Sequence, residues 1–224
     1  MKAVLELTEV MPRRTNAEWT EPFSLDVPRG TWTVIRTTPE RSHRLARTIV
    51  GTEDCSSGQV VVRGESTAGL GRTARRSLLA TLGVLLDPAG LMSNLTLADN
   101  LIVPSVFRGT KGQVVKREVV MRLFESLGIT EFADHRPSDV PEDVRQLGAL
   151  ARAIVGEPQL LILENPLAAV RSRAATDIWR FCRDLVPTAI VTTFRRDEML
   201  YDVANDLYLW DSAGLRRASA GSAA

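Results

Sequence analysis

The sequence predicts an α/β protein built on a mostly parallel β-sheet, with a small antiparallel sheet beside it and a helical region inserted in the chain. Three observations predict this class. The first segments alternate apolar and polar residues, later segments are short apolar runs, and stretches with helical spacing of apolar residues separate those runs. Strands that alternate with helices of this length imply right-handed crossovers, so the strands pair in parallel and helices cover both faces of the sheet.

The antiparallel sheet is predicted at the N-terminal end. Residues 3–9 and 23–27 have the period of two that is typical of half-buried strands, and Pro28-Arg29-Gly30 follows as a turn. A further strand is predicted at residues 59–64, which the chain enters through a Ser57-Gly58 turn.

A strand–loop–helix unit lies between these segments. Residues 32–35 predict a buried strand, residues 36–41 a loop, and residues 42–50 a helix that ends at Gly51. Later, a basic polar stretch from Arg72 to Arg76 leads to a predicted strand at residues 82–86.

The middle of the chain is predicted to be largely helical. Apolar residues at helical spacing indicate helices at residues 96–104, 113–128 and 142–155. Two apolar strands follow at residues 160–163 and 189–193, on either side of a helix at residues 168–185.

The chain has 224 residues, of which 44% are hydrophobic, enough to bury the core of one α/β domain. We expect a single domain over residues 1–224. Its core and β-subdomain comprise about residues 1–87 and 157–217, a helical lobe about residues 88–156, and a small polar tail residues 218–224.

Charge and cysteine content exclude several classes. The formal net charge is only +1, so no uniform field recruits nucleic acid or an anionic membrane surface. No apolar run is long enough to span a bilayer and no secretory pattern opens the sequence, so we expect a cytoplasmic chain. Cys55 and Cys182 are interpreted as small buried hydrophobes, not as a disulfide or a metal site.

The order of the segments resembles the nucleotide-binding subunit of ABC transporters over roughly residues 3–215. Its clearest part is the block from Pro137 to Leu163, which is similar to the signature helix and the Walker B strand of that family. Supporting matches are found at residues 24–30, 57–60, 94–100 and 203–206. The resemblance implies a P-loop NTPase-like ABC cassette.

The same resemblance implies that the P-loop is degenerate. A phosphate-binding loop needs glycines, a lysine and a hydroxyl that binds magnesium, and the loop here contains no glycine. In the register set by Gly51, Ser42 takes the position of the lysine and His43 that of the hydroxyl. The altered positions of this loop are Arg36, Pro39, Arg41, Ser42 and His43.

The remaining motifs depart from the family in the same direction. Asp87 replaces the Q-loop glutamine, and Pro141, Glu142 and Asp143 replace the core of the signature, where two carboxylates repel a triphosphate. At the end of the Walker B strand the family's Asp-Glu becomes Glu164-Asn165, and an amide cannot act as a general base. Arg171 stands at the D-loop position and Phe194 at the H-loop position.

These losses predict a structural or regulatory subunit of a membrane ABC transporter that does not hydrolyse ATP and needs neither ATP nor magnesium as a cofactor. The resemblance implies two partners, a membrane permease and a second ATPase subunit, which is an intact one in a heterodimer or a copy of this chain. It implies a peripheral position on the inner face of the membrane. The net charge of +1 gives no reason to expect a nucleic acid partner. Candidate permease contacts are Leu86, Asp87, Leu91, Met92 and Asn94.

Several alternatives stay open on the sequence. The chain is also interpretable as a residual ATPase that is active only in a mixed dimer, or as a soluble interaction module on the same fold. Trp19 offers an aromatic platform for a base. An anion site at Arg36, Arg41, His43 and Arg44 is weighed against a solvated or ion-paired face.

Overall fold

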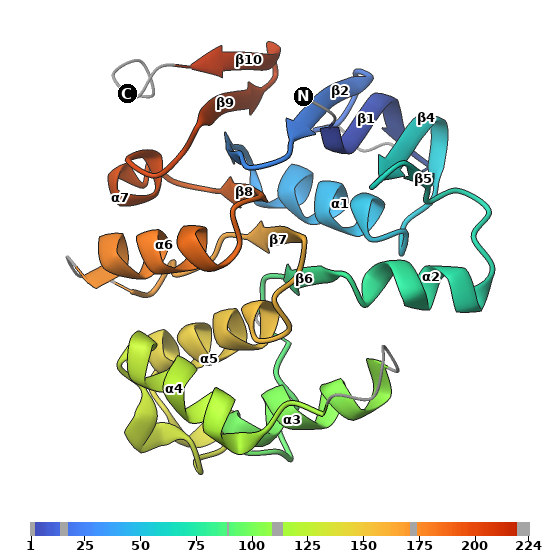
Figure 1. The fold of residues 1–224 in the computed structure, drawn as a ribbon. Coiled ribbons are helices and arrows are strands. Elements are labelled where there is room, and N and C mark those ends of the chain that lie inside the picture. Colours follow the sequence, from blue (N-terminus) through green and yellow to red (C-terminus); the bar gives the residue numbers. More distant parts are fainter. Residues whose placement is uncertain (1–2, 14–17, 89, 109–113, 171–173, 219–224) are drawn as a thin grey trace.

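A small antiparallel sheet packs over one end of the molecule (Figure 1). The computed structural model describes residues 3–13, 18–88, 90–108, 114–170 and 174–218. The strands of this sheet are β1 (Ala3–Pro12), β2 (Phe23–Pro28), β4 (Cys55–Val62) and β5 (Glu65–Ser66), in the order β2-β1-β4-β5. The predicted antiparallel sheet is therefore confirmed.

β4 begins four residues earlier than predicted, at Cys55 in place of Gln59, because it also pairs with the end of β1. Gly58 makes this pairing possible. Its φ is +80°, and a Cβ at this position would lie 2.2 Å from the carbonyl oxygen of Glu9 in β1. A side chain there would push the two strands apart. Cys55 itself is only half-buried, so its expected burial was wrong, whereas Cys182 is fully buried.

The larger sheet is mostly parallel, as predicted. Its strands are β3 (Trp32–Arg36), β6 (Leu82–Leu85), β7 (Leu160–Glu164), β8 (Ala189–Thr193), β9 (Asp206–Asp211) and β10 (Gly214–Ala218). Their order is β10-β9-β3-β8-β7-β6, with parallel pairing from β9 to β6 and β10 antiparallel to β9. The hairpin of β9 and β10 was not predicted.

Helices cover both faces of this sheet (Figure 1). α1 (Pro39–Ile49) lies between the two sheets, and α2 (Arg72–Leu79) precedes β6. The helical region consists of α3 (Leu97–Arg108), α4 (Arg117–Leu127) and α5 (Glu142–Ile154), with short 3₁₀ turns at Thr130–Phe132 and Pro137–Asp139. α6 (Ala174–Leu185) and α7 (Glu198–Tyr201) complete the other face.

Several predicted helix boundaries also differ from the structure. The loop predicted at residues 36–41 is shorter, because α1 already begins at Pro39. The basic stretch that starts at Arg72 is helical, because Leu78 anchors α2 on the protein. The helix predicted from residue 113 begins at Arg117, and the helix predicted from residue 168 is described from Ala174.

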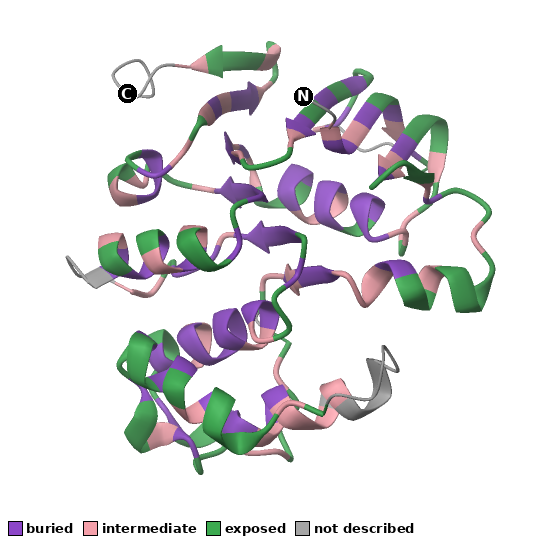
Figure 2. Ribbon diagram, viewed as in Figure 1, coloured by how far each residue is buried: buried purple, intermediate pink, exposed green. Residues whose placement is uncertain are grey.

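The strands of the parallel sheet separate two hydrophobic cores (Figure 2). In β7, Leu161 and Leu163 point into the core shared with α5 and α6, whereas Leu160 and Ile162 point toward α1. This is the period-two alternation of a strand that is buried on both faces. The strand is apolar from Leu160 to Leu163 because each of its two faces packs against a hydrophobic core.

Gly83 in β6 permits close packing of α5 on the sheet. A Cβ there would lie 2.3 Å from the carbonyl oxygen of Ala153, which belongs to the backbone of α5 and cannot turn away. We expect Gly83→Ala to lower the free energy of unfolding by about 1–3 kcal/mol, measured by urea unfolding.

Gly71→Ala is the matched control, since no atom lies within 4 Å of its added Cβ and its φ is −62°. We expect the control to change stability by less than about 1 kcal/mol. Equal losses in the two variants would contradict the packing role of Gly83.

Candidate functional site

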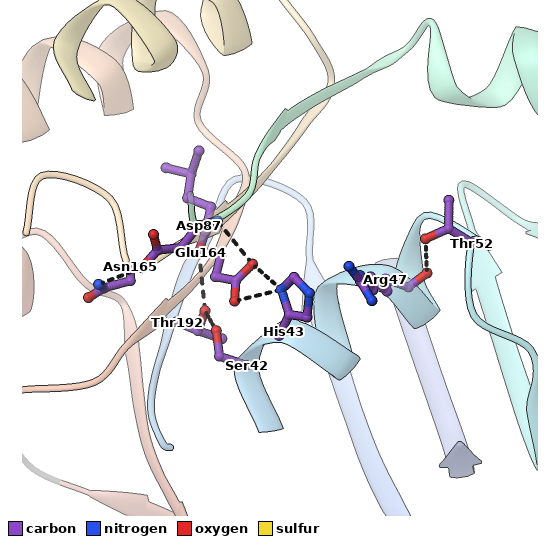
Figure 3. A network of polar contacts seen from close by, with 9 residues as sticks. Ser42, His43, Arg47, Thr52, Asp87, Glu164, Asn165 and Thr192 are labelled. Atoms are coloured by element: carbon purple, nitrogen blue, oxygen red, sulfur yellow. Dashed lines mark hydrogen bonds and ion pairs between the residues drawn. The ribbon is translucent and has the colours of Figure 1, made fainter. Parts of the chain in front are cut away.

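The candidate site lies where the carboxyl ends of the parallel strands meet the start of α1. The side chains of Ser42 and His43 come from α1, Glu164 and Asn165 from the end of β7 and the residue after it, and Asp87 from the loop after β6. Figure 3 shows that His43 points toward Glu164, Asn165 toward Asp87, and Ser42 toward Thr192. Ligands of open α/β sheets bind at this edge.

The connection from β3 to α1 is short. Only Thr37 and Thr38 separate the two elements, and the Thr38 side chain caps the helix by accepting a hydrogen bond from the Arg41 N–H. Pro39 at the first helical position and Glu40 in the first turn both favour a helix start here. The local sequence therefore selects a helix in the place of the predicted loop.

Arg41 is buried and turned away from the other site residues. Its Nε donates to the Glu18 carbonyl oxygen at 2.5 Å, and its guanidinium lies 5.6 Å from the centre of the Trp210 ring. The Glu18 carboxylate also contacts the Thr38 hydroxyl. These contacts tie the start of α1 to β9 and to the segment before β2.

Trp19 does not form the platform that the sequence suggested. Its side chain is only 1% exposed, and its ring makes edge contacts with Phe23 and Trp210. The expectation of an open aromatic platform was wrong, because this indole is part of the hydrophobic core beneath the antiparallel sheet.

The next α1 side chains are held by the sheet. The Ser42 hydroxyl lies 2.6 Å from that of Thr192 in β8, and His43 Nδ1 lies 3.2 Å from Glu164 Oε2. Arg44 forms ion pairs with Glu40 and Glu53, each at 2.9 Å. Three of the four residues considered as an anion site, Arg41, His43 and Arg44, are thus paired within the protein, which favours the ion-paired alternative.

Glu164 is the most buried ionisable group of the site. Its side chain is 2% exposed, and its Oε2 accepts the Asp87 backbone N–H at 3.1 Å. Burial raises the pKa of this carboxyl, the hydrogen bonds from Asp87 and His43 lower it, and the net direction is upward.

Asn165 completes the group. Its side-chain amide donates to Asp87 Oδ2 at 3.1 Å, and its backbone N–H donates to the Thr192 carbonyl oxygen at 2.8 Å. Its φ is +42°, a left-handed conformation that asparagine tolerates better than most residues. This turn aims the amide at Asp87.

The signature positions form a separate, exposed surface. Pro141, Glu142 and Asp143 lie at the start of α5, where Glu142 pairs with Arg145 and the Asp143 carboxylate accepts the Val144 N–H. The acidic first turn suits a helix N-terminus. These contacts stay within α5, so they do not join the group around Glu164.

Phe194 lines a cavity of about 790 Å³ between the segments that follow β7 and β8. Asn165 lines the same cavity and also donates a hydrogen bond to Asp87. Arg171, the predicted D-loop residue, lies outside the described residues.

The predicted permease contacts lie on the segment between β6 and α3. Leu86, Asp87 and Leu91 are half-buried, whereas Met92 and Asn94 are exposed. The turn is built by a buried asparagine, Asn100, whose side chain accepts the Met92 N–H at 2.7 Å and donates to the Met92 carbonyl oxygen at 3.1 Å.

The structure adds site residues that the sequence analysis missed. Glu18, Thr192 and Trp210 contact the start of α1 from positions more than twenty residues away in the chain, and only the fold brings them together. No local pattern signals these contacts. Within the described ranges, no group of three His, Cys, Asp or Glu side chains is placed to hold a metal ion.

The sequence profile of the ABC transporter family matches residues 44–168. The Nod factor export ATP-binding protein I of Rhizobium sp. (strain N33) is 29% identical over 157 residues, which cover 69% of this chain and 50% of that protein. The spermidine/putrescine import ATP-binding protein PotA of Nitrosospira multiformis is 26% identical over 203 residues, covering 88% of this chain and 54% of that protein. The chain spans about half the length of these curated relatives.

Solved cassettes have the same fold. The dimeric ATP-binding cassette MJ0796 bound to ADP and Pi superposes with a TM-score of 0.82 at 17% identity, covering 96% of this chain and 98% of that chain. CbiO1 of Clostridium perfringens, part of an ABC transporter complex, gives a TM-score of 0.75 at 16% identity, covering 96% of this chain and 88% of that chain. In the part of the chain that the structure describes, no helix has both the length and the apolar character of a membrane span.

The raised pKa of Glu164 predicts a pH dependence of stability. Because the folded chain holds this proton more tightly than the unfolded chain, the contribution of Glu164 is fully present below its ordinary pKa of 4.5 and is lost as pH rises through the raised pKa. Glu164→Gln removes this titration. We therefore expect the variant to gain stability relative to the unchanged chain as pH rises from about 4 to about 8, measured by urea unfolding.

Glu125→Gln, on an exposed position of α4, is the control and should follow the unchanged chain at every pH. A constant difference between Glu164→Gln and the unchanged chain over the whole pH range would refute this expectation.

Proposed function

This chain belongs to the ABC transporter family. We propose that it is a cassette subunit of a membrane transporter and that it does not hydrolyse ATP. In this proposal it acts as a structural or regulatory subunit. It docks on a permease at the cytoplasmic face of the membrane and pairs with a second, intact ATPase subunit.

The start of α1 at Pro39 carries this proposal. A P-loop holds phosphate through successive backbone N–H groups that have no partner in the protein. Here Pro39 has no N–H, the Arg41 N–H bonds the Thr38 hydroxyl, and the Ser42 N–H bonds the Thr38 carbonyl oxygen at 3.0 Å. Two of the N–H groups at this helix start are therefore bonded to Thr38, and Pro39 has none to offer a phosphate.

The side chains at the magnesium positions support the same proposal. Magnesium in such sites requires hydroxyl and carboxylate oxygens that are open to the ion. His43, at the position of the magnesium-binding hydroxyl, offers no oxygen, and the Glu164 carboxylate bonds His43 and the Asp87 N–H. The residues present do not fit a magnesium–nucleotide complex, and no catalytic step is assigned to it.

The position of Asn165 supports the absence of hydrolysis. Its amide donates to Asp87 and carries no basic oxygen that would take a proton from water at neutral pH. Two separate requirements, phosphate binding and general-base catalysis, are therefore unmet by the residues at their positions.

The proposed partners rest on the family and on its relatives. The relatives that match this chain are named as export or import ATP-binding proteins, and the matching MJ0796 cassette is a dimer. We place the permease contact at the segment that includes Leu91, Met92 and Asn94, where Met92 is 37% exposed. Pairing with an intact subunit leaves one site with a functional P-loop on the partner.

Nucleotide binding to the purified chain tests the proposal. We expect no heat of binding in calorimetry and no rise of Tm at millimolar ATP with magnesium, because the backbone donors at the start of α1 are occupied. A ligand at a hundred times its Kd would add about 2.7 kcal/mol of stability, which a thermal shift resolves.

An intact cassette ATPase treated identically serves as the positive control. A rise of Tm that grows with ATP concentration would overturn the proposal in favour of a residual ATPase, which predicts turnover only in the mixed assembly. Failure of any permease to co-purify with the chain from a membrane extract would favour the soluble interaction module.

Asn165→Glu places a carboxylate where the family has its general base. General-base catalysis contributes about 10²- to 10⁴-fold, but only for a substrate that is already bound. We expect phosphate release by this variant to stay at the level of Asn165→Gln, a control of the same size without the charge. Release clearly above that control would show that nucleotide binds and that only the base was missing.

A further inference from the structure

We infer that this chain contains a nucleotide-independent lock, in which His43, Glu164 and Asn165 hold Asp87, a residue of the connection from β6 to the helical lobe, against the core. The inference rests on the proposed function, because contacts between side chains replace nucleotide as the link between α1, β7 and this connection. The lock is a conformational device built from the residues shown in Figure 3.

The first link joins α1 to β7. His43 Nδ1 lies 3.2 and 3.3 Å from the two carboxylate oxygens of Glu164, so the imidazole bridges helix and strand. The neighbouring Ser42 hydroxyl lies 2.6 Å from Thr192 Oγ1, and Thr192 in turn donates toward the Leu163 carbonyl oxygen at 3.4 Å. Two adjacent α1 residues therefore fix the helix on two strands.

The second link joins β7 to Asp87 at two points. The Glu164 carboxylate accepts the backbone N–H of Asp87, and the Asn165 amide donates to the Asp87 side chain. Burial of Glu164 strengthens its hydrogen bond, because a hydrogen bond in a low-dielectric interior is stronger than the same bond in water. Both the main chain and the side chain of Asp87 are held by consecutive residues of β7 and its end.

Asp87 lies two residues after the end of β6, in the segment that leads to α3. Beyond it, the Gly90 carbonyl oxygen accepts from Arg152 of α5 at 2.8 Å, and Asn100 holds the turn at Met92. On the far side of α5, the Gln146 side chain accepts the Ala169 N–H at 2.9 Å. Hydrogen bonds therefore join the helical lobe to the core at Gln146 and Ala169. The bonds from Glu164 and Asn165 to Asp87 join the connection before the lobe to the core.

Hydrogen exchange measured by mass spectrometry, without any nucleotide, tests the lock. We expect His43→Ala and Asn165→Gly to speed exchange in peptides covering residues 86–97 by about tenfold, since a local opening becomes easier when one of its hydrogen bonds is lost. Glycine is chosen at position 165 because the φ of +42° disfavours alanine. Peptides of β1 and β2 should exchange at the unchanged rate.

Two variants sharpen the test. His43→Asn keeps a donor at the position of Nδ1 and should restore slow exchange, which mere loss of helix packing would not predict. Arg44→Ala removes the ion pairs of the next α1 residue and should leave residues 86–97 as in the unchanged chain. Should His43→Ala fail to fold, Asn165→Gly carries the test alone.

Unchanged exchange at residues 86–97 in both His43→Ala and Asn165→Gly would overturn the lock. If Arg44→Ala speeds exchange at residues 86–97 as much as His43→Ala does, the lock is also overturned. The faster exchange would then follow from a general disturbance of α1. Since no nucleotide is present, these outcomes are independent of ATP binding, whose detection would instead overturn the proposed function.

Discussion

The buried carboxylate of Glu164 is the constraint on which the arrangement of the site depends. A carboxylate that is 2% exposed is costly unless donors surround it, and it obtains them from His43 of α1 and from the Asp87 backbone. Each donor comes from a different element, so the need to compensate one charge positions three segments together. Asn165 then adds a bond to Asp87 from the other side.

The hydrophobic framework is independent of this group. Leu161 and Leu163 fill one core, Leu160 and Ile162 the other, and Glu164 follows at the end of the same strand. Changes at the carboxyl end of β7 therefore alter the chemistry without removing any core side chain. Because of this separation, residues at this edge of the sheet can change while the cassette fold is kept.

The C-terminal hairpin takes part in shaping the start of α1. The Trp210 carbonyl oxygen accepts from the Thr37 hydroxyl at 2.8 Å and from Arg41 at 3.3 Å, and the Trp210 ring lies under the Arg41 guanidinium. Trp19 packs edge-on against the same ring. The aromatic residues and the arginine thus form one interior contact between the antiparallel sheet and β9, in place of an open surface for a base.

The sequence by itself determined the fold class, the two sheets and the placement of the helical region, because these follow from periods of two and 3.6 that burial imposes on local segments. We did not predict from the sequence that α1 begins at Pro39, although Thr38 and Pro39 are residues typical of a helix N-terminus. We also did not predict the hairpin of β9 and β10. Only the tertiary structure decided that Ser42 bonds Thr192 and that Glu18 holds Arg41. Such bonds join residues far apart in the chain, and no local periodicity encodes which distant partner a buried polar group finds.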